Sequence, residues 1–212
     1  MTQPLKDKNG LTEEEFLAQY TPKDYPQPSL TSDICVFRRH PQGRLQLLLV
    51  QRGGHPCLGM WATPGGFCNP NETADACAKR ELAEETHVEG LKLEPLGLYS
   101  TPGRDPRGWT VSYAFVAFDE IGVTAQADDD AARALWFDVD AVLRGDAVML
   151  SLTRTDGEET VLSSSFHLAH RPLSGRPYAT GVRGQGLAFD HAQIVADAWL
   201  AVSEALAPGR PA

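Results

Sequence analysis

Hydrophobic residues along the chain gather in short runs that turn residues separate. Runs at 30–38 and 45–51 flank the sequence RHPQGR, and LQLLLV in the second run is continuously apolar, as in a strand buried on both faces of a mixed sheet. A run at 91–101 contains a proline, and a run at 109–118 alternates larger with smaller side chains. The pattern predicts a sheet that includes these four strands.

The N-terminal segment predicts a short helix followed by an arm. Thr12 and Glu15 have the spacing of a capping box, so a helix should begin after Thr12. The proline-rich stretch TPKDYPQPS ends that helix and continues as an extended arm, which could lie on its own domain or on a partner subunit. We therefore expect a helix and arm at 1–29, a main domain at 30–206 and a disordered tail at 207–212.

The region before the C-terminus predicts additional strands. Strand-like runs at 147–153 and 159–166 flank the turn sequence TDG, which is typical of a hairpin. We interpret this hairpin as part of an insertion at about 145–185, and the segment 138–144 before it predicts a short helix.

The last part of the chain predicts a loop and a helix. Residues 167–186 are basic and rich in turn formers, and loops of this length in a compact domain are often functional. An amphipathic helix should follow, from about Leu187 to Leu206, and Asp190 could be its N-terminal cap.

The segment Gly65–Val88, GGFCNPNETADACAKRELAEETHV, departs from the usual amphipathic pattern. On a helix, Glu81 and Glu85 fall inside the apolar stripe and Glu84 lies beside them, although acids normally occupy the solvent face. At an effective dielectric constant of about 20, each close pair of these carboxylates repels by roughly 3 kcal/mol. Arg80 could neutralise one acid only, whereas Mg²⁺ or Mn²⁺ prefers such oxygen ligands. The alternative is a solvated, charged helix face.

Composition and charge limit the classes of partner. The chain has 212 residues, 42% hydrophobic and 22% charged, which indicates a globular protein of one domain or one domain with an elaboration. Its 19 basic and 28 acidic residues give a net charge of −9 without a compensating basic cluster, so we do not expect nucleic acid as a partner. No run approaches 18 apolar residues, so we do not expect membrane insertion.

Cysteine usage and the N-terminus bear on the compartment. The four cysteines show no CxxC pair and no zinc-like spacing, which favours reduced thiols in a cytoplasmic protein: Cys35, Cys57, Cys68 and Cys77. The start MTQPLKDKNG has no apolar core of signal-peptide length.

The glutamate-rich segment resembles the signature of a known family. Gly66, then Glu72, then RELAEETHV at 80–88 has the spacing of the Nudix box of the Nudix hydrolases. Every fixed position matches except one, because His87 stands where that pattern has glycine. The glycine usually closes the helix in a left-handed conformation, and histidine is among the residues that tolerate positive φ. We therefore expect the helix and its carboxylates to survive this substitution.

This resemblance implies an α/β fold of the Nudix type, with a mixed β-sheet sandwiched between helices. It implies that Glu81 and Glu85 bind Mg²⁺ or Mn²⁺, that Glu84 completes the metal shell and that Arg80 orients Glu84. It also implies a further metal-binding or base carboxylate from the loop before Trp136, which would be Asp130 or Asp129. The general base is then either a helix glutamate or Asp130.

The resemblance also implies substrate contacts. The loop sequence RDPRG at 104–108 and the phrase AFDH at 188–191 are similar to Nudix proteins that handle ADP-ribose. Arg104 and Arg107 suit a diphosphate, because arginine binds phosphate in bidentate geometry, although a basic surface loop is the commoner explanation for such a pair. Arg52 could be a phosphate contact or a surface charge. Gly65 and Gly66 would let the backbone come close to the site, where a Cβ would be crowded. Glu72 would hold the junction between loop and helix.

The function implied is hydrolysis of a nucleoside diphosphate linked to another group, with ADP-ribose cleaved to AMP and ribose 5-phosphate. The alternative is a regulatory protein of the same fold that senses ADP-ribose and usually carries a DNA-binding winged helix after the Nudix domain. Here the residues after 143 predict a hairpin, a loop and one helix instead of the successive helices of such a module. A homodimer is a further possibility that the family suggests.

Overall fold

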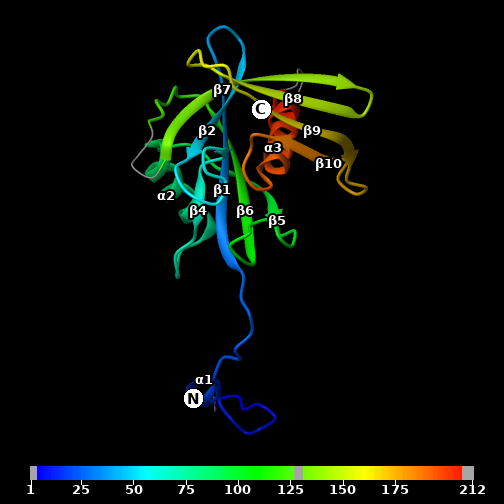
Figure 1. The fold of residues 1–212 in the computed structure, drawn as a ribbon. Coiled ribbons are helices and arrows are strands. Elements are labelled where there is room, and N and C mark those ends of the chain that lie inside the picture. The colour runs from blue at the N-terminus through cyan, green and yellow to red at the C-terminus, as the bar shows by residue number, and fades with distance from the viewer. Residues whose placement is uncertain (1–3, 127–130, 207–212) are drawn as a thin grey trace.

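One curved mixed sheet organises the chain (Figure 1). The structure is a computed structural model that describes residues 4–126 and 131–206. The centre of the sheet is β1 (Ser29–Arg39), which pairs in parallel with β6 (Thr110–Asp119) and antiparallel with β2 (Leu45–Arg52). The strand order is β10-β9-β8-β7-β2-β1-β6-β5, with β3 on β2 and β4 on β1. The other strands are β3 (Trp61–Ala62), β4 (Gly65–Phe67), β5 (Glu94–Tyr99), β7 (Ala131–Arg144), β8 (Ala147–Arg154), β9 (Val161–His170) and β10 (Pro177–Gln185).

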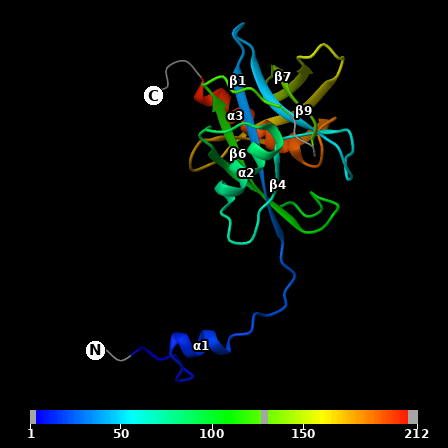
Figure 2. The ribbon, with the colours of Figure 1, turned by 90° about the vertical axis from the view of Figure 1, so that its left-hand side faces the viewer.

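Two helices cover opposite faces of the central strands (Figure 2). Successive side chains of a strand point to opposite faces, so Ile34 and Val36 of β1 pack with α2 (Ala74–Thr86) while Phe37 faces the cluster of α3 (His191–Ala205). The run 45–51 is buried on both faces as its continuous apolar pattern predicts. The predicted sheet between helices is therefore confirmed.

The N-terminal helix α1 (Glu13–Gln19) stands away from the sheet at the end of an extended segment (Figure 1). Its capping box is confirmed, since the Thr12 hydroxyl accepts from the backbone N–H of Glu15 at 3.2 Å and the Glu15 carboxylate accepts from the Thr12 N–H at 2.8 Å. No residue of α1 is buried. Contact of this arm with a partner subunit stays a prediction, and the predicted tail at 207–212 lies outside the described residues.

The predicted helix at 138–144 is wrong, because these residues form the second half of β7. They pair with β8 from Asp138 opposite Thr153 to Arg144 opposite Ala147, which closes a tight hairpin. The buried Val139 lies opposite the buried Leu152, so cross-strand packing outweighs the weak local preference for a helix. The predicted hairpin of β8 and β9 is confirmed.

The predicted long loop at 167–186 is also wrong, because it contains the end of β9 and the whole of β10. Two of its glycines, Gly184 and Gly186, are sites of close approach instead of loop signals. A Cβ on Gly184 would meet the Cβ of Ala192 at 2.4 Å, and one on Gly186 would meet Leu162 at 2.5 Å. Glycine therefore lets β10 pack directly against α3 and β9.

Two further observations concern the cysteines and the length of the helices. The four cysteines are free, with Cys35 and Cys77 buried. Among the described helices, none is both long and apolar enough to cross a membrane.

Candidate active site

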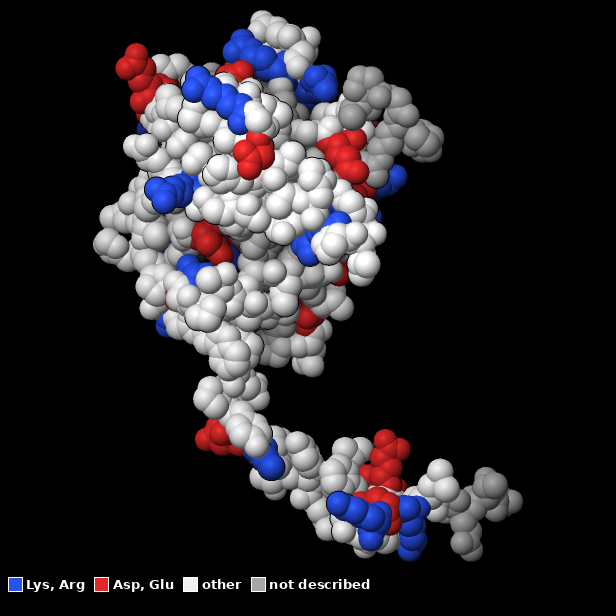
Figure 3. Space-filling model, turned by 90° about the vertical axis from the view of Figure 1, so that its right-hand side faces the viewer, with Lys and Arg blue, Asp and Glu red and all other residues white. Residues whose placement is uncertain are grey.

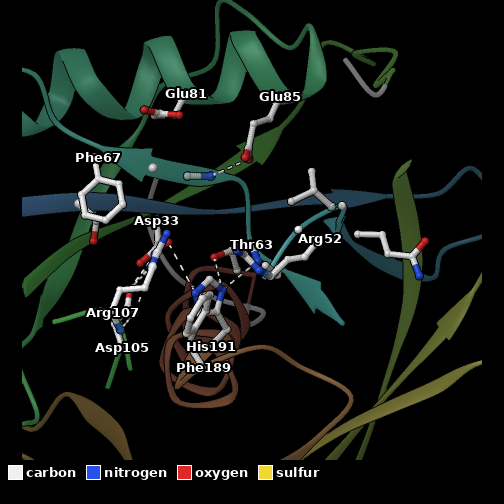
Figure 4. Close-up of a pocket in the computed structure, with 18 of the residues that line it drawn as sticks. Asp33, Arg52, Thr63, Phe67, Glu81, Glu85, Asp105, Arg107, Phe189 and His191 are labelled. Atoms are coloured by element: carbon white, nitrogen blue, oxygen red, sulfur yellow. Dashed lines mark hydrogen bonds and ion pairs between the residues drawn. The ribbon is translucent and has the colours of Figure 1, made fainter. Parts of the chain in front are cut away.

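A cavity of about 480 Å³ opens beside the glutamate helix (Figure 4). Its walls come from α2, from β1, β3 and β4, from the loop at 104–107 and from the start of α3. Segments that are far apart in sequence thus meet there, and most of the predicted site residues line it: Arg52, Gly65, Gly66, Arg80, Glu81, Glu85, Arg104 and Arg107.

The backbone of β4 approaches α2 closely, as the sequence predicts. The N–H of Gly65 donates to Oε2 of Glu85 at 2.9 Å. A Cβ on Gly66 would lie 2.5 Å from an oxygen of Glu81, and one on Gly65 would lie 2.2 Å from the Ser32 carbonyl oxygen. Only glycine fits at position 65, and a side chain at position 66 would have to displace the Glu81 carboxylate, so these glycines let the helix carboxylates sit directly against the strand.

Arg80 links four groups around this junction. Its guanidinium donates to Glu72 at 2.9 Å, to Glu81 at 2.7 Å, to Glu84 at 2.9 Å and to the Phe67 carbonyl at 3.0 Å. The predicted contact between Arg80 and Glu84 is present. Glu72 also accepts from the Asn69 N–H at 2.8 Å, which holds the turn before α2 as predicted.

Burial leaves the carboxylates of Glu81 and Glu85 in an unfavourable environment. Desolvation raises the pKa of Glu85 to about 7, although the hydrogen bond from Gly65 opposes the shift. Desolvation also raises the pKa of Glu81, although Arg80 opposes it. Neighbouring acids add to both shifts, so a cation between these carboxylates would restore their ordinary ionisation.

The residues fit a hard divalent cation in chemistry but are not a finished metal site. Carboxylate oxygens are the ligands that Mg²⁺ and Mn²⁺ prefer. In the described residues no three acidic, histidine or cysteine groups already converge in metal-binding geometry. The side chain of Glu84 is 59% exposed and lies outside the cavity lining, held by Arg80. Asp130 and Asp129 lie outside the described residues, so the predicted further carboxylate stays a prediction.

Arg52 and Arg107 line the cavity, and the guanidinium group of each lies near an aromatic ring. The guanidinium carbon of Arg52 lies 4.9 Å from the ring centre of Phe189, and its Nε donates to the Pro56 carbonyl at 2.8 Å. The guanidinium carbon of Arg107 lies 4.9 Å from the ring centre of Phe67 and 5.5 Å from that of Phe189. Arg107 also donates to the Asp105 carboxylate at 2.7 Å. Phosphate binding by Arg52 and Arg107 stays a prediction.

Arg104 is placed differently from Arg107. Its side chain is only 5% exposed, and it donates to both oxygens of Asp190 at 2.9 and 2.7 Å. Asp190 stands at the N-terminal cap position of α3, as the sequence suggests, but its side chain makes no capping hydrogen bond. The carboxylate is instead engaged by Arg104, whose charge it neutralises.

A buried network at the floor of the cavity escaped sequence reasoning. His191 Nδ1 accepts from the Thr63 N–H at 3.0 Å, which leaves the ring proton on Nε2, 3.7 Å from Oδ1 of Asp33. The Ser112 hydroxyl donates to the other oxygen of Asp33 at 2.5 Å. Burial lowers the pKa of His191 and favours the neutral ring. Asp33 was detectable as the one acid inside a buried apolar strand, and His191 as part of the phrase AFDH.

Comparison with known proteins agrees with this geometry. The NUDIX domain model matches residues 29–155. An ADPR responsive transcriptional repressor, NtrR, of Acinetobacter baylyi is 36% identical over 140 residues, which are 65% of this chain and 56% of that protein. An ADP-ribose pyrophosphatase of Methanocaldococcus jannaschii is 41% identical over 115 residues, which are 54% of this chain and 64% of that protein. The chain thus spans about three fifths of the length of these relatives.

A solved structure extends the likeness to the C-terminal elements. The crystal structure of a MutT/nudix family protein from Enterococcus faecalis is 32% identical, with a TM-score of 0.72, and the match covers 92% of this chain and 70% of that chain. The match therefore continues past residue 155 into the added strands and α3. The family model spans more than half of the 212 residues, and the chain belongs to the Nudix family.

Proposed function

We propose that this protein hydrolyses the diphosphate bond of a nucleoside diphosphate linked to another group, with Mg²⁺ or Mn²⁺ as cofactor. The observation that carries the proposal is the placement of half-buried carboxylates and of arginines around one cavity. We assign Glu81 and Glu85 to the cation, and Arg52 and Arg107 to phosphate oxygens; all four line the cavity (Figure 4).

Each group has a distinct role in this reaction. A bound cation would lower the pKa of water and neutralise charge on the diphosphate. Glu81 and Glu85 would hold it, while Gly65 keeps Glu85 in place through its N–H. Arg52 and Arg107 would orient the diphosphate so that water attacks phosphorus and the bridging P–O bond breaks. The proton of the attacking water would pass to a helix glutamate or to Asp130.

We further propose ADP-ribose as the substrate, with AMP and ribose 5-phosphate as products. Support comes from the ADP-ribose pyrophosphatase that is 41% identical and from the repressor whose name includes ADPR responsiveness. The two phrases that suggested this substrate, RDPRG and AFDH, meet in the structure through the pair of Arg104 with Asp190.

Product analysis tests both levels of the proposal. Purified protein incubated with ADP-ribose and MgCl₂ should release AMP and ribose 5-phosphate, and a chelator should stop the release. A panel of other dinucleotides runs in parallel. Turnover of one of them without turnover of ADP-ribose would overturn the substrate and keep the reaction class, whereas no turnover with any metal would overturn the reaction.

A second candidate function is ADP-ribose sensing without significant hydrolysis. It is favoured by the 36% identity to a transcriptional repressor. Against it, residues 156–206 form β9, β10 and α3, without the successive helices of a winged helix. On the face shown in Figure 3, Lys and Arg are interspersed with Asp and Glu and form no single basic surface. Gel shifts with promoter DNA, run beside the AMP assay, separate the two functions.

The remaining expectations are proposals of the same kind. We propose a cytoplasmic protein, in line with its four free cysteines, and one without a nucleic-acid partner. A homodimer stays a prediction that sedimentation of the purified chain can test.

A further inference from the structure

A second cleft of about 700 Å³ adjoins the active-site cavity. The two share Arg104 and Phe189 as a common wall. The cleft lies between the loop at 101–106, β10 and the first turn of α3. About half of its lining residues therefore lie beyond the 29–155 span of the family match.

The two compartments differ in chemistry. The active-site cavity presents acids and arginines, whereas side chains of Met60, Tyr99, Val182 and Leu187 line the cleft. Arg52 and Arg107, the two arginines near the Phe189 ring, line the cavity and not the cleft. A charged diphosphate suits the first compartment, and a flat, largely apolar group suits the second.

The wall between the compartments is held in place from both sides. Phe189 has φ of 50°, a left-handed conformation that is unusual for an aromatic residue. The next two residues are anchored, because Asp190 binds Arg104 and His191 accepts from Thr63. Backbone strain of this kind persists only where the surroundings enforce it, so the position of the ring is fixed before any ligand binds.

We propose that this cleft binds the nucleobase of the substrate whose diphosphate occupies the active-site cavity, an inference that rests on the proposed function. The apolar side chains of the cleft, Met60, Val182 and Leu187, suit the two apolar faces of a base better than the hydroxyl groups of a sugar. Gln193, which also lines the cleft, donates its amide N–H groups to the Ala179 carbonyl at 3.1 Å and to Asp197 at 2.9 Å. These bonds orient the amide, and no hydrogen bond to its oxygen is present within the described residues. That oxygen can accept from an exocyclic amino group such as that of adenine.

Binding of the two product halves tests this assignment. Thr101 lines the mouth of the cleft and is exposed, so Thr101→Trp fills the cleft without disturbing the core. Thr153, an exposed residue of β8 that lines neither compartment, gives the matched control Thr153→Trp. Calorimetric titrations with AMP and with ribose 5-phosphate are made on wild type and both variants, after circular dichroism has shown that all three are folded.

We expect Thr101→Trp to weaken AMP binding at least about tenfold while ribose 5-phosphate binding stays within about twofold, and Thr153→Trp to change neither. Loss of ribose 5-phosphate binding alone, or no change in either affinity, would overturn the nucleobase assignment. The assignment can fail separately from the proposed function. If Thr101→Trp weakens AMP binding but the wild type turns over no substrate, only the proposed function is overturned. If the wild type turns over substrate but Thr101→Trp leaves its affinity for AMP unchanged, only the assignment of the cleft is overturned.

Discussion

The backbone N–H of Gly65 donates to Oε2 of Glu85 across 2.9 Å, which ties β4 to the last turn of the glutamate helix. The contact joins residues that are twenty positions apart and needs glycine at 65, because a Cβ there would collide with β1. It fixes one oxygen of the carboxylate and leaves the other for a ligand in the cavity.

Glu85→Gln tests the role of that carboxylate. Glutamine keeps an oxygen that can accept from Gly65, so the fold should survive, but the negative charge is lost. We expect the turnover number to fall by at least ~100-fold, the scale seen when an electrostatic stabiliser of the transition state is removed. The control is Glu89→Gln, an exposed acid beyond the end of the helix, which should leave the turnover number unchanged. Unchanged turnover in Glu85→Gln would remove the metal assignment.

The raised pKa of Glu85 predicts how metal binding depends on pH. The folded protein holds a proton on this group up to about pH 7, whereas the ordinary value is 4.5. In the absence of metal, the contribution of this group to stability is fully present below pH 4.5 and is lost as the pH rises through 7. A cation competes with the proton, so Mg²⁺ should raise the melting temperature more at pH 8 than at pH 5.

Thermal scans at pH 5, 6, 7 and 8, with and without MgCl₂, measure this effect. The comparison with Glu85→Gln removes the contributions of other titrating groups. We expect the difference between wild type and variant to grow with pH up to about 7 and then to level off. A magnesium-induced shift that is the same at every pH in the wild type would contradict the role of Glu85.

The two arginines of the RDPRG loop should respond differently to substitution. Arg104 is buried and neutralises Asp190, so Arg104→Ala leaves a carboxylate without its partner and should cost about 3 kcal/mol or more of stability. The side chain of Arg107 is 42% exposed, but its partner Asp105 is only 5% exposed, so Arg107→Ala also leaves a buried carboxylate unpaired and should likewise cost about 3 kcal/mol of stability. Only Arg107→Ala should also raise KM for the substrate about tenfold, because a phosphate contact is lost.

Urea unfolding and steady-state kinetics on both variants separate the two effects. A raised KM in Arg104→Ala together with an unchanged KM in Arg107→Ala would show that the roles are reversed. An unchanged KM in Arg107→Ala would place this arginine outside the substrate site.

Features specified by neighbouring residues could be predicted from the sequence. The apolar runs of β1 and β2, the capping box at Thr12 and the spacing of Glu81 and Glu85 all lie within short segments. A glycine at position 66 could also be predicted, because a Cβ there would crowd the Glu81 carboxylate of the helix.

Features specified by distant contacts could not be predicted. Asp33 and His191 are 158 positions apart in sequence and meet only because β1 and the start of α3 flank the same cavity. Arg104 and Asp190 were assigned separately to phosphate binding and helix capping, and only the fold brings them together. Gly184 and Gly186 were misleading for the same reason, since their partners Ala192 and Leu162 lie on other elements.

Removal of residues 1–27 should leave the stability of the remaining chain nearly unchanged. Helix α1 buries no residue, and the first backbone contact of β1, from the Ser29 N–H to the Trp109 carbonyl, is retained. We expect the free energy of unfolding in urea to change by less than about 0.5 kcal/mol. A larger loss that depends on protein concentration would show instead that the arm stabilises an oligomer, which sedimentation can verify.

His87 stands at the position where the Nudix pattern has glycine, and its backbone conformation predicts how substitutions there change stability. It ends α2 with φ of 55° and ψ of 22°, and its N–H donates to the Ala83 carbonyl at 2.9 Å. The left-handed conformation costs an L-residue about 1–2 kcal/mol, and glycine avoids this cost but loses about 0.5–1 kcal/mol through greater freedom of the unfolded chain. His87→Gly should therefore stabilise the protein by about 0.5–1 kcal/mol, whereas the β-branched His87→Val should destabilise it. Urea unfolding of the three proteins gives the order directly, and a His87→Gly variant less stable than wild type would mean that contacts of the imidazole outweigh the backbone strain.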